Sequence, residues 1–179
     1  TELFNGEAYG GFARDRERAV DIVSGCFLLI ERELWEALGG FDPAFFMYGE
    51  EADLCLRAAT KVARPAITPE APIIHYGGAS ETARTGKMVR LLTAKTDLIN
   101  RHFPWWAQGL GKVLLGAWPL SRLVALRFAA MLTGSARFGD AALTWGEIWN
   151  RREDWRYGYA GRALPASAPP PMPPSAASR

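Results

Sequence analysis

Apolar side chains follow a helical period through much of the second half of the chain. Residues 85–103 carry them at spacings of three and four, which predicts one long helix that Pro104 ends or kinks. A second helix is predicted over 138–154. The side chains expected to face inward from this second helix are Leu143, Ile148 and Trp149.

The segment between these two helices is the most apolar part of the chain. Residues 105–133 are interrupted only by a few charged residues and one proline, namely Lys112, Pro119, Arg122 and Arg127. Because no run of about 18 uncharged apolar residues occurs, we reject a membrane-spanning helix. Two interpretations stay open in equal measure. One is a helix lying in the membrane interface, which tryptophans flanked by Lys and Arg would suit, and the other is a helical hairpin packed on the core.

The first half alternates between predicted strands and helices. A continuous apolar run over 20–30 predicts a buried strand, in which Gly25 suggests a bulge or a close backbone approach. Short helices are predicted over 31–38, which Gly39-Gly40 ends, and over 50–59. A second short strand is expected to end at His75. These elements together predict an α/β fold class.

Composition is that of an ordinary globular domain, with 49% hydrophobic and 22% charged residues, and this excludes a disordered or disulfide-scaffold protein. Cys26 and Cys55 each lie in an apolar run, so we expect buried thiols of a reducing compartment. The tail over 161–179 is rich in Pro, Ala and Ser and is predicted to be disordered. The chain opens with Thr1 and no signal peptide, which suggests a fragment or a processed product.

The net charge of +2 conceals two halves of opposite sign. Residues 1–80 carry 7 Lys and Arg against 13 Asp and Glu, a balance of −6, whereas residues 81–137 carry 9 against 2, a balance of +7. The acidic half could hold a cation or a catalytic carboxylate, and the basic half could face a membrane surface or a polyphosphate. Nucleic acid is a poor partner, because aromatic residues do not interleave with the basic ones.

Three carboxylates crowd the start of the helix predicted over 50–59, namely Glu50, Glu51 and Asp53. Helix capping and dipole compensation would explain them without any catalytic role. The apolar, aromatic segment 45–48 directly before them favours a water-excluding pocket, in which one carboxylate could act as a general base. His75 at a strand end is either structural or ligand-binding. Arg84 begins a basic stretch that is either a solvated helix face or a pyrophosphate contact.

Five stretches in order resemble the C-terminal half of the catalytic domain of family 2 glycosyltransferases, with the bacterial rhamnosyltransferase-like enzymes as the nearest branch. These stretches are residues 23–30, 39–42, 45–57, 69–71 and 75–80. The resemblance implies a partial GT-A fold, a Rossmann-like mixed sheet followed by C-terminal helices. It divides the chain into an acceptor-side part of that domain over 1–80, a helical region over 81–160 and the tail.

The resemblance also implies an inverting transfer of a sugar to an acceptor hydroxyl in bacterial polysaccharide assembly. Glu51 matches the family's catalytic base, where the usual residue is Asp, and Asp53 is the second candidate for that role. The residues that it places on the acceptor side are Gly40, Phe41, Asp42 and Glu50, and those on the donor side are Ser24, Gly25 and Arg84. His75 matches a histidine that helps to hold a divalent metal in some members.

The partners implied are a nucleotide-diphosphate sugar, a lipid-linked or glycan acceptor and an anionic membrane surface. The implied cofactor is Mg²⁺ or Mn²⁺, and the implied location is the cytoplasm or the inner face of the plasma membrane. No Asp-x-Asp motif occurs in residues 1–20, so we expect a truncated enzyme that does not bind nucleotide sugar tightly alone.

Two rival hypotheses belong to other functional classes. One is a non-catalytic module that binds a membrane or a partner through the helices of 85–155. The other is a metal hydrolase built on Glu51, Asp53 and His75, which we reject because a second histidine at ligand spacing is missing.

Overall fold

The computed structural model describes residues 12–74 and 84–159, and helices dominate this part of the chain. In chain order the elements are β1 (Arg18–Ala19), α1 (Arg32–Leu38), α2 (Glu50–Ala59), β2 (Ala66–Ile67), α3 (Arg84–His102), α4 (Trp105–Thr133), α5 (Ala136–Asn150) and α6 (Arg152–Trp155). The helices predicted over 31–38, 50–59 and 85–103 are therefore confirmed. The helix predicted over 138–154 forms as α5 and α6.

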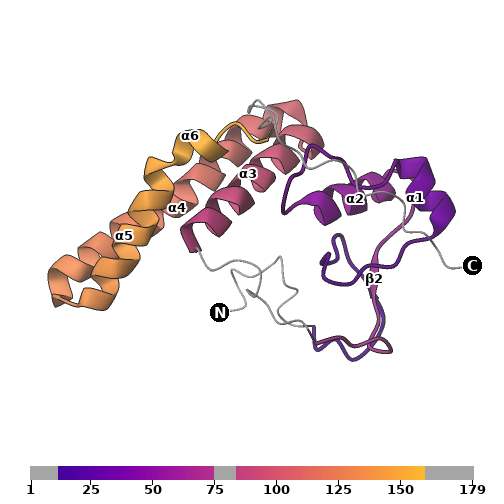
Figure 1. Cartoon of the computed structure of the whole chain (residues 1–179), viewed down its shortest axis with the longest axis horizontal. Coiled ribbons are helices and arrows are strands. Elements are labelled where there is room, and N and C mark those ends of the chain that lie inside the picture. Colours follow the sequence, from indigo (N-terminus) through magenta and orange to yellow (C-terminus); the bar gives the residue numbers. More distant parts are fainter. Residues whose placement is uncertain (1–11, 75–83, 160–179) are drawn as a thin grey trace, which may run out of the picture.

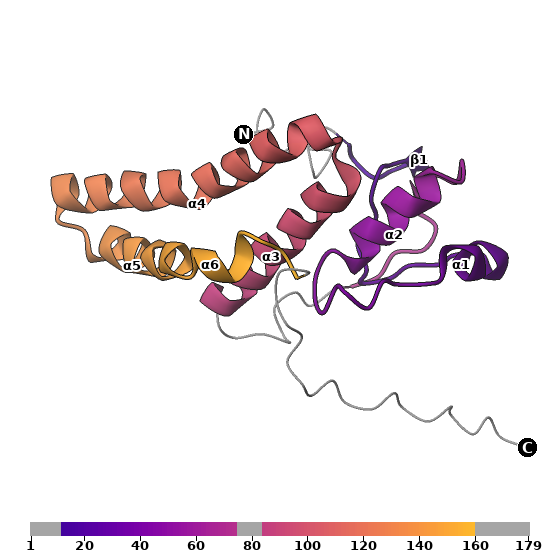
Figure 2. The same cartoon turned by 90° about the horizontal axis from the view of Figure 1, so that it is seen from above.

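The molecule is elongated, with α3 between two unlike parts (Figure 1). On one side α4 and α5 run antiparallel as a long hairpin, and on the other lie α1 and α2 with their connecting loops. The view from above shows the same separation (Figure 2). Contacts of α3 with α4, α5 and α6 on one side and with α2 on the other join the two parts.

The core follows α3 along its length. One cluster is formed by Val89 and Leu92 of α3 with Ile148 and Trp155, whose indole Nε1 donates to the carbonyl of Ile148 over 3.1 Å. A second cluster joins Ala94 of α3 to the loop before α2 and to the end of the described chain, through Phe45 and Tyr159. Burial of Ile148 agrees with the sequence prediction, whereas Leu143 is 72% exposed, so its inward placement was wrong.

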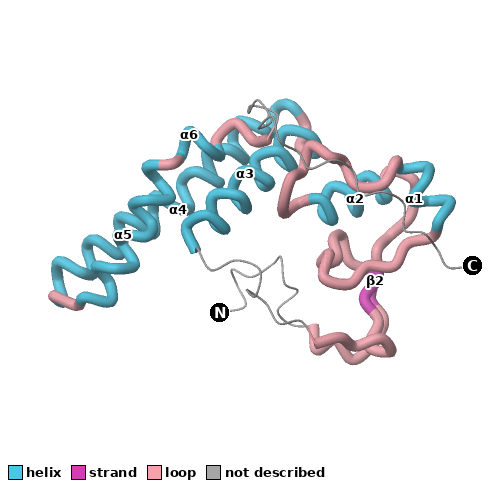
Figure 3. The backbone as a smooth tube through the Cα atoms, in the orientation of Figure 1, coloured by secondary structure: helices cyan, strands magenta, loops and turns pink. Residues whose placement is uncertain are grey.

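The predicted strand over 20–30 does not form, and these residues make a loop (Figure 3). A strand needs a neighbour for its backbone groups, and within the described ranges only β1 and β2 pair, antiparallel, with Arg18 opposite Ile67. Cys26 is consequently exposed, which corrects the expectation of a buried thiol, while Cys55 is buried and both thiols are free. Residues 73–74 are also loop, and His75 lies outside the described residues.

The described residues thus combine helices with one small two-stranded sheet, which is compatible with the predicted α/β class. The GT-A sheet expected from the resemblance stays a prediction. So do the domain bounds, and the tail over 161–179 lies outside the described residues.

Helix α4 bears on the rejection of a membrane-spanning helix, which rested on the absence of an uncharged apolar run. It is 29 residues long, and by length and composition it is apolar enough to cross a membrane. The rejection above required an uncharged run, but the three basic residues of α4 are spaced widely enough that an 18-residue window holds at most two charges. Only 11% of that window is buried, so α4 packs on α3 and α5 with one side and leaves the other open.

The end of the described chain is attached to α3 through a buried carboxylate. Asp97 is 1% exposed, and its Oδ2 accepts the backbone N–H of Tyr159 over 2.8 Å. Gly158 just before it has a φ of 81°, and an added Cβ there would lie 2.1 Å from Asp97 Oδ1. This approach is possible only for a residue without a side chain.

We expect Gly158→Ala to lower the free energy of unfolding by about 3 kcal/mol, because it adds both a left-handed backbone penalty and a clash in a closed site. Urea unfolding followed by circular dichroism measures the change. Gly134→Ala is the matched control, since Gly134 has a φ of 62° and nothing within 4 Å of an added Cβ. It should cost about 1 kcal/mol. An equal loss of unfolding free energy in the two variants would contradict the close approach of Gly158 to Asp97.

Candidate functional site

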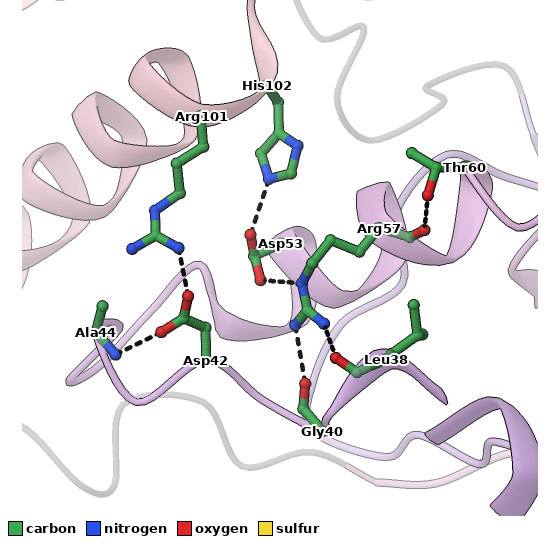
Figure 4. A network of polar contacts seen from close by, with 9 residues as sticks. All are labelled: Leu38, Gly40, Asp42, Ala44, Asp53, Arg57, Thr60, Arg101 and His102. Carbon is green, nitrogen blue, oxygen red and sulfur yellow. Dashed lines mark hydrogen bonds and ion pairs between the residues drawn. The ribbon is translucent and has the colours of Figure 1, made fainter. Parts of the chain in front are cut away.

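The centre of the candidate site is the buried carboxylate of Asp53, in the first turn of α2 and 1% exposed. Its Oδ2 accepts from Arg57 Nε over 2.7 Å, and its Oδ1 lies 2.8 Å from His102 Nε2 at the end of α3 (Figure 4). Because a carboxylate can only accept, the proton of the imidazole lies on Nε2. Both oxygens of Asp53 are therefore engaged, and they tie α2 to α3.

Arg57 carries this connection on to α1. Its two terminal nitrogens donate to the carbonyl oxygens of Leu38 over 2.7 Å and of Gly40 over 2.8 Å (Figure 4). Carbonyls at the end of a helix lack partners within the helix, so a guanidinium satisfies them well. Gly39 ends α1 in the left-handed conformation with φ 74°, as the glycine pair predicted. One arginine in the last turn of α2 thus joins the end of α1 to α2.

Asp42 forms a second bridge to α3. Its carboxylate accepts the backbone N–H of Ala44 over 2.8 Å and pairs with Arg101, whose guanidinium also lies 4.9 Å from the centre of the Phe45 ring. The bond from Ala44 and then that from Arg101 lower the pKa of Asp42 below its usual value. The loop from Gly40 to Phe45 is therefore held in place from both ends.

The aromatic segment before α2 is divided between core and surface. Phe45 is 6% exposed and packs on Tyr159, whose hydroxyl donates to the carbonyl of Met47. Burial raises the pKa of Tyr159. Phe46 is 71% exposed, and Phe41, at 41%, packs edge-on against Trp35. The segment therefore anchors the start of α2 with one residue and presents another to the surface.

Glu50 and Glu51 begin α2 and are both half-buried. In each, Oε2 is buried and has no hydrogen-bond partner among the described residues. Burial raises the pKa of Glu50, and the charge of Glu51 raises it further, against a lowering by its own backbone N–H. An unpartnered buried carboxylate oxygen costs stability, and no described residue compensates this cost at either Oε2.

Glu51 faces away from Asp53, toward the loop over 22–28. A Cβ added at Gly25 would lie 3.5 Å from Glu51 Cβ and 3.6 Å from Cδ, so the backbone of this loop covers the Glu51 side chain. The same loop lines an open cavity of about 500 Å³ through Ser24 and apolar residues such as Val23 and Phe27, and Glu51 is not one of its lining residues. Glu51 thus lies under the same loop that forms the cavity wall.

The structure brings the predicted residues together in two groups. Gly25 lies against Glu51, with Ser24 in the same loop, and the backbone of Gly40 joins Asp53 through Arg57. Arg84 is the first residue of α3. Which of these residues contact sugar or phosphate stays a prediction.

Sequence analysis missed Arg57, Arg101 and His102. The spacing of Arg57, four residues after Asp53 on a helix, is a signal that could have found it. The two residues at the end of α3 carry no such signal, because they are 59 and 49 residues from their partners in sequence.

The expected divalent metal finds no ligand set in the described part of the chain. Within 12–74 and 84–159, no three His, Cys, Asp or Glu side chains gather closely enough to hold a metal ion. His75 lies outside these ranges, so Mg²⁺ or Mn²⁺ and the role of His75 stay predictions. We assign no metal ligand and no metal-dependent step to the residues described.

Comparisons with known proteins relate the chain to rhamnosyltransferases. It is 32% identical over 124 residues, 68% of its own length, to the N-acetylglucosaminyl-diphospho-decaprenol L-rhamnosyltransferase of Mycobacterium tuberculosis. It is 32% identical over 95 residues, 49% of its length, to the rhamnosyltransferase WbbL of Escherichia coli. These matches span 38% and 36% of the relatives. No protein-family model and no solved structure matches the chain.

Removing the charge of Asp53 should loosen the attachment of α2 to α1 and α3. We expect Asp53→Asn to lower the free energy of unfolding by about 2 kcal/mol, since it leaves Arg57 without its anion in a largely buried site. Urea unfolding measures the loss. The control is Glu153→Gln, which breaks an ion pair with Arg156 whose side chains are 60% and 48% exposed. It should cost less than about 0.5 kcal/mol. A control as costly as Asp53→Asn would refute the bridge.

Glu50→Gln should stabilise the protein at neutral pH. The pKa of Glu50 is raised by folding, so the folded state favours the protonated form and is penalised when Glu50 ionises. The gain from the amide is therefore present well above pH 4.5 and disappears as the pH falls through the pKa of the folded state. Thermal unfolding at pH 7 and at pH 3.5 tests the sign. A gain that persists unchanged at low pH would show that charge burial is not its cause.

Proposed function

We propose that this chain belongs to an inverting glycosyltransferase that moves rhamnose from a nucleotide-diphosphate donor to a hydroxyl of a lipid-linked acceptor. The relationship to rhamnosyltransferases supports sugar transfer in general. The acceptor class follows the relative whose name specifies an N-acetylglucosaminyl-diphospho-decaprenol. The chain spans little more than a third of that relative, so the complete activity is proposed for the full-length protein.

The observation that carries the proposal is the Glu51 carboxylate, which lies against Gly25 and has one buried oxygen without a partner among the described residues. In the proposed step the acceptor oxygen attacks the anomeric carbon and the bond from that carbon to the diphosphate oxygen breaks. The nucleotide diphosphate leaves with the bonding electrons, and Glu51 takes the hydroxyl proton. A positioned base of this kind is worth about 10²- to 10⁴-fold in rate.

Asp53 has a different role in this proposal. Its two oxygens are held by Arg57 and His102, and its side chain is 1% exposed, so an acceptor hydroxyl would have to displace existing partners to reach it. Asp53 is therefore a positioning residue, and the role of base falls to Glu51. Gly40 and Asp42 belong to the same framework through Arg57 and Arg101.

Glu51→Gln in the full-length protein should lower kcat for rhamnosyl transfer by at least about 100-fold, because the amide cannot accept the proton. Transfer of labelled rhamnose to an N-acetylglucosaminyl-diphospho-prenol acceptor measures the rate, and circular dichroism verifies the fold. Glu50→Gln is the matched control and should act mainly on KM for the acceptor. Full activity in Glu51→Gln, or an equal loss of kcat in Glu50→Gln, would remove Glu51 from the role of base.

A further inference from the structure

Helix α4 presents a long apolar face that no described residue covers. Side chains along it are between 58% and 73% exposed, namely Trp106, Leu110, Val113, Val124, Phe128 and Met131. Successive positions are three or four residues apart, except for one step of 11 residues, which is about three turns, so at 3.6 residues per turn they form one stripe along the helix. A single exposed apolar side chain is ordinary, but a continuous stripe of this length marks an interaction surface.

The charged residues of α4 are exposed, and each reaches a residue of α3 or α5. Lys112 Nζ donates to Asn100 Oδ1 of α3 over 3.1 Å. The Arg122 guanidinium lies over the rings of Trp118 and Trp145, 5.4 and 5.5 Å from their centres. The Arg127 guanidinium lies beside Gly146 of α5. The stripe itself therefore contains no charged residue, and Arg127 lies at its edge.

The charged residues of α4 itself have one sign. α4 holds no Asp or Glu, and residues 84–137 carry nine Lys and Arg against the single carboxylate of Asp97, which is buried inside the protein. An apolar face on a helix whose charged side chains are all cationic matches an anionic lipid surface, where each nearby Lys or Arg adds about 1 kcal/mol of attraction. Trp105, 85% exposed at the start of α4, suits the boundary between headgroups and acyl chains.

The hairpin decides the orientation of α4 at such a surface. α5 packs antiparallel along α4 in both views and carries the exposed side chains of Arg137, Asp140 and Glu147 (Figures 1 and 2). If α4 crossed a bilayer with this hairpin intact, these ionised groups would enter the hydrocarbon, which costs several kcal/mol for each group. In the plane of the interface they stay in water above the helix.

We propose that α4 lies in the plane of an anionic membrane surface, with the stripe from Trp106 to Met131 facing the acyl chains. The inference deepens the proposed function, because a lipid-linked acceptor is presented at such a surface. It does not depend on catalysis, and binding is measured separately from transfer.

The test is co-sedimentation of the whole chain with vesicles of phosphatidylglycerol and phosphatidylcholine, and with vesicles of phosphatidylcholine alone. We expect binding to the anionic vesicles, at least a tenfold weaker association in 0.5 M NaCl and release by alkaline carbonate. The double variant Val113→Glu, Phe128→Glu should lose at least tenfold in binding. Both side chains are exposed, so the fold should persist, as circular dichroism verifies.

Val62→Glu is the matched control, because Val62 is 93% exposed in the loop after α2 and far from the stripe in sequence and in the fold. It should bind vesicles as the unsubstituted chain does. The full-length double variant should transfer rhamnose to a water-soluble, short-chain acceptor at an unchanged rate, which separates this inference from the assignment of Glu51. Failure of the folded chain to bind anionic vesicles would overturn the proposal. So would resistance to carbonate, which indicates a span, or a dimer that the double variant dissociates without any lipid binding.

Discussion

The arrangement of α1, α2 and α3 depends on one buried charge. Asp53 is removed from water, and an ionised carboxylate tolerates this only with close cationic and hydrogen-bonding partners. Arg57 is one partner and also donates to the carbonyl of Leu38 at the end of α1. His102, at the end of α3, is the other partner. This network therefore joins three helices, and the Asp42–Arg101 pair and the packing of Phe45 on α3 hold the loop from Gly40 to Phe45 beside them.

The start of α2 holds both the structural carboxylate Asp53 and the proposed base Glu51, and helical geometry separates the two. Residues two apart on a helix point to opposite sides, so Asp53 faces the protein while Glu51 faces the loop over 22–28. A base is effective only when its oxygen is held in place relative to the reacting hydroxyl. Rigid attachment of α2 through Asp53 would supply this for Glu51, while α3 connects the site to the hairpin that we propose lies at the membrane.

Local patterns predicted the helices well and the strands badly. Apolar spacing, the glycine pair after Leu38 and Pro104 before α4 are signals that a helix carries within its own sequence, so α1, α2, α3 and their ends were predictable. A strand depends on partners elsewhere, and the run over 20–30 has none among the described residues. The acidic start of α2 was equally predictable from sequence, but the different surroundings of Glu51 and Asp53 were not. These surroundings depend on His102 and Arg101 of α3, which is distant in sequence and contacts α2 and the loop before it.

Chemical rescue tests the central claim most directly, since it separates a residue that accepts a proton from one that holds others in place. In the full-length protein, Glu51→Ala removes the carboxylate and leaves room for a small anion, so added formate should restore part of the rhamnosyl transfer rate in proportion to its concentration. Asp53→Ala should gain nothing from formate, because a free anion does not replace a tethered bridge between helices. Rescue of Asp53→Ala without rescue of Glu51→Ala would contradict the account and make Asp53 the base.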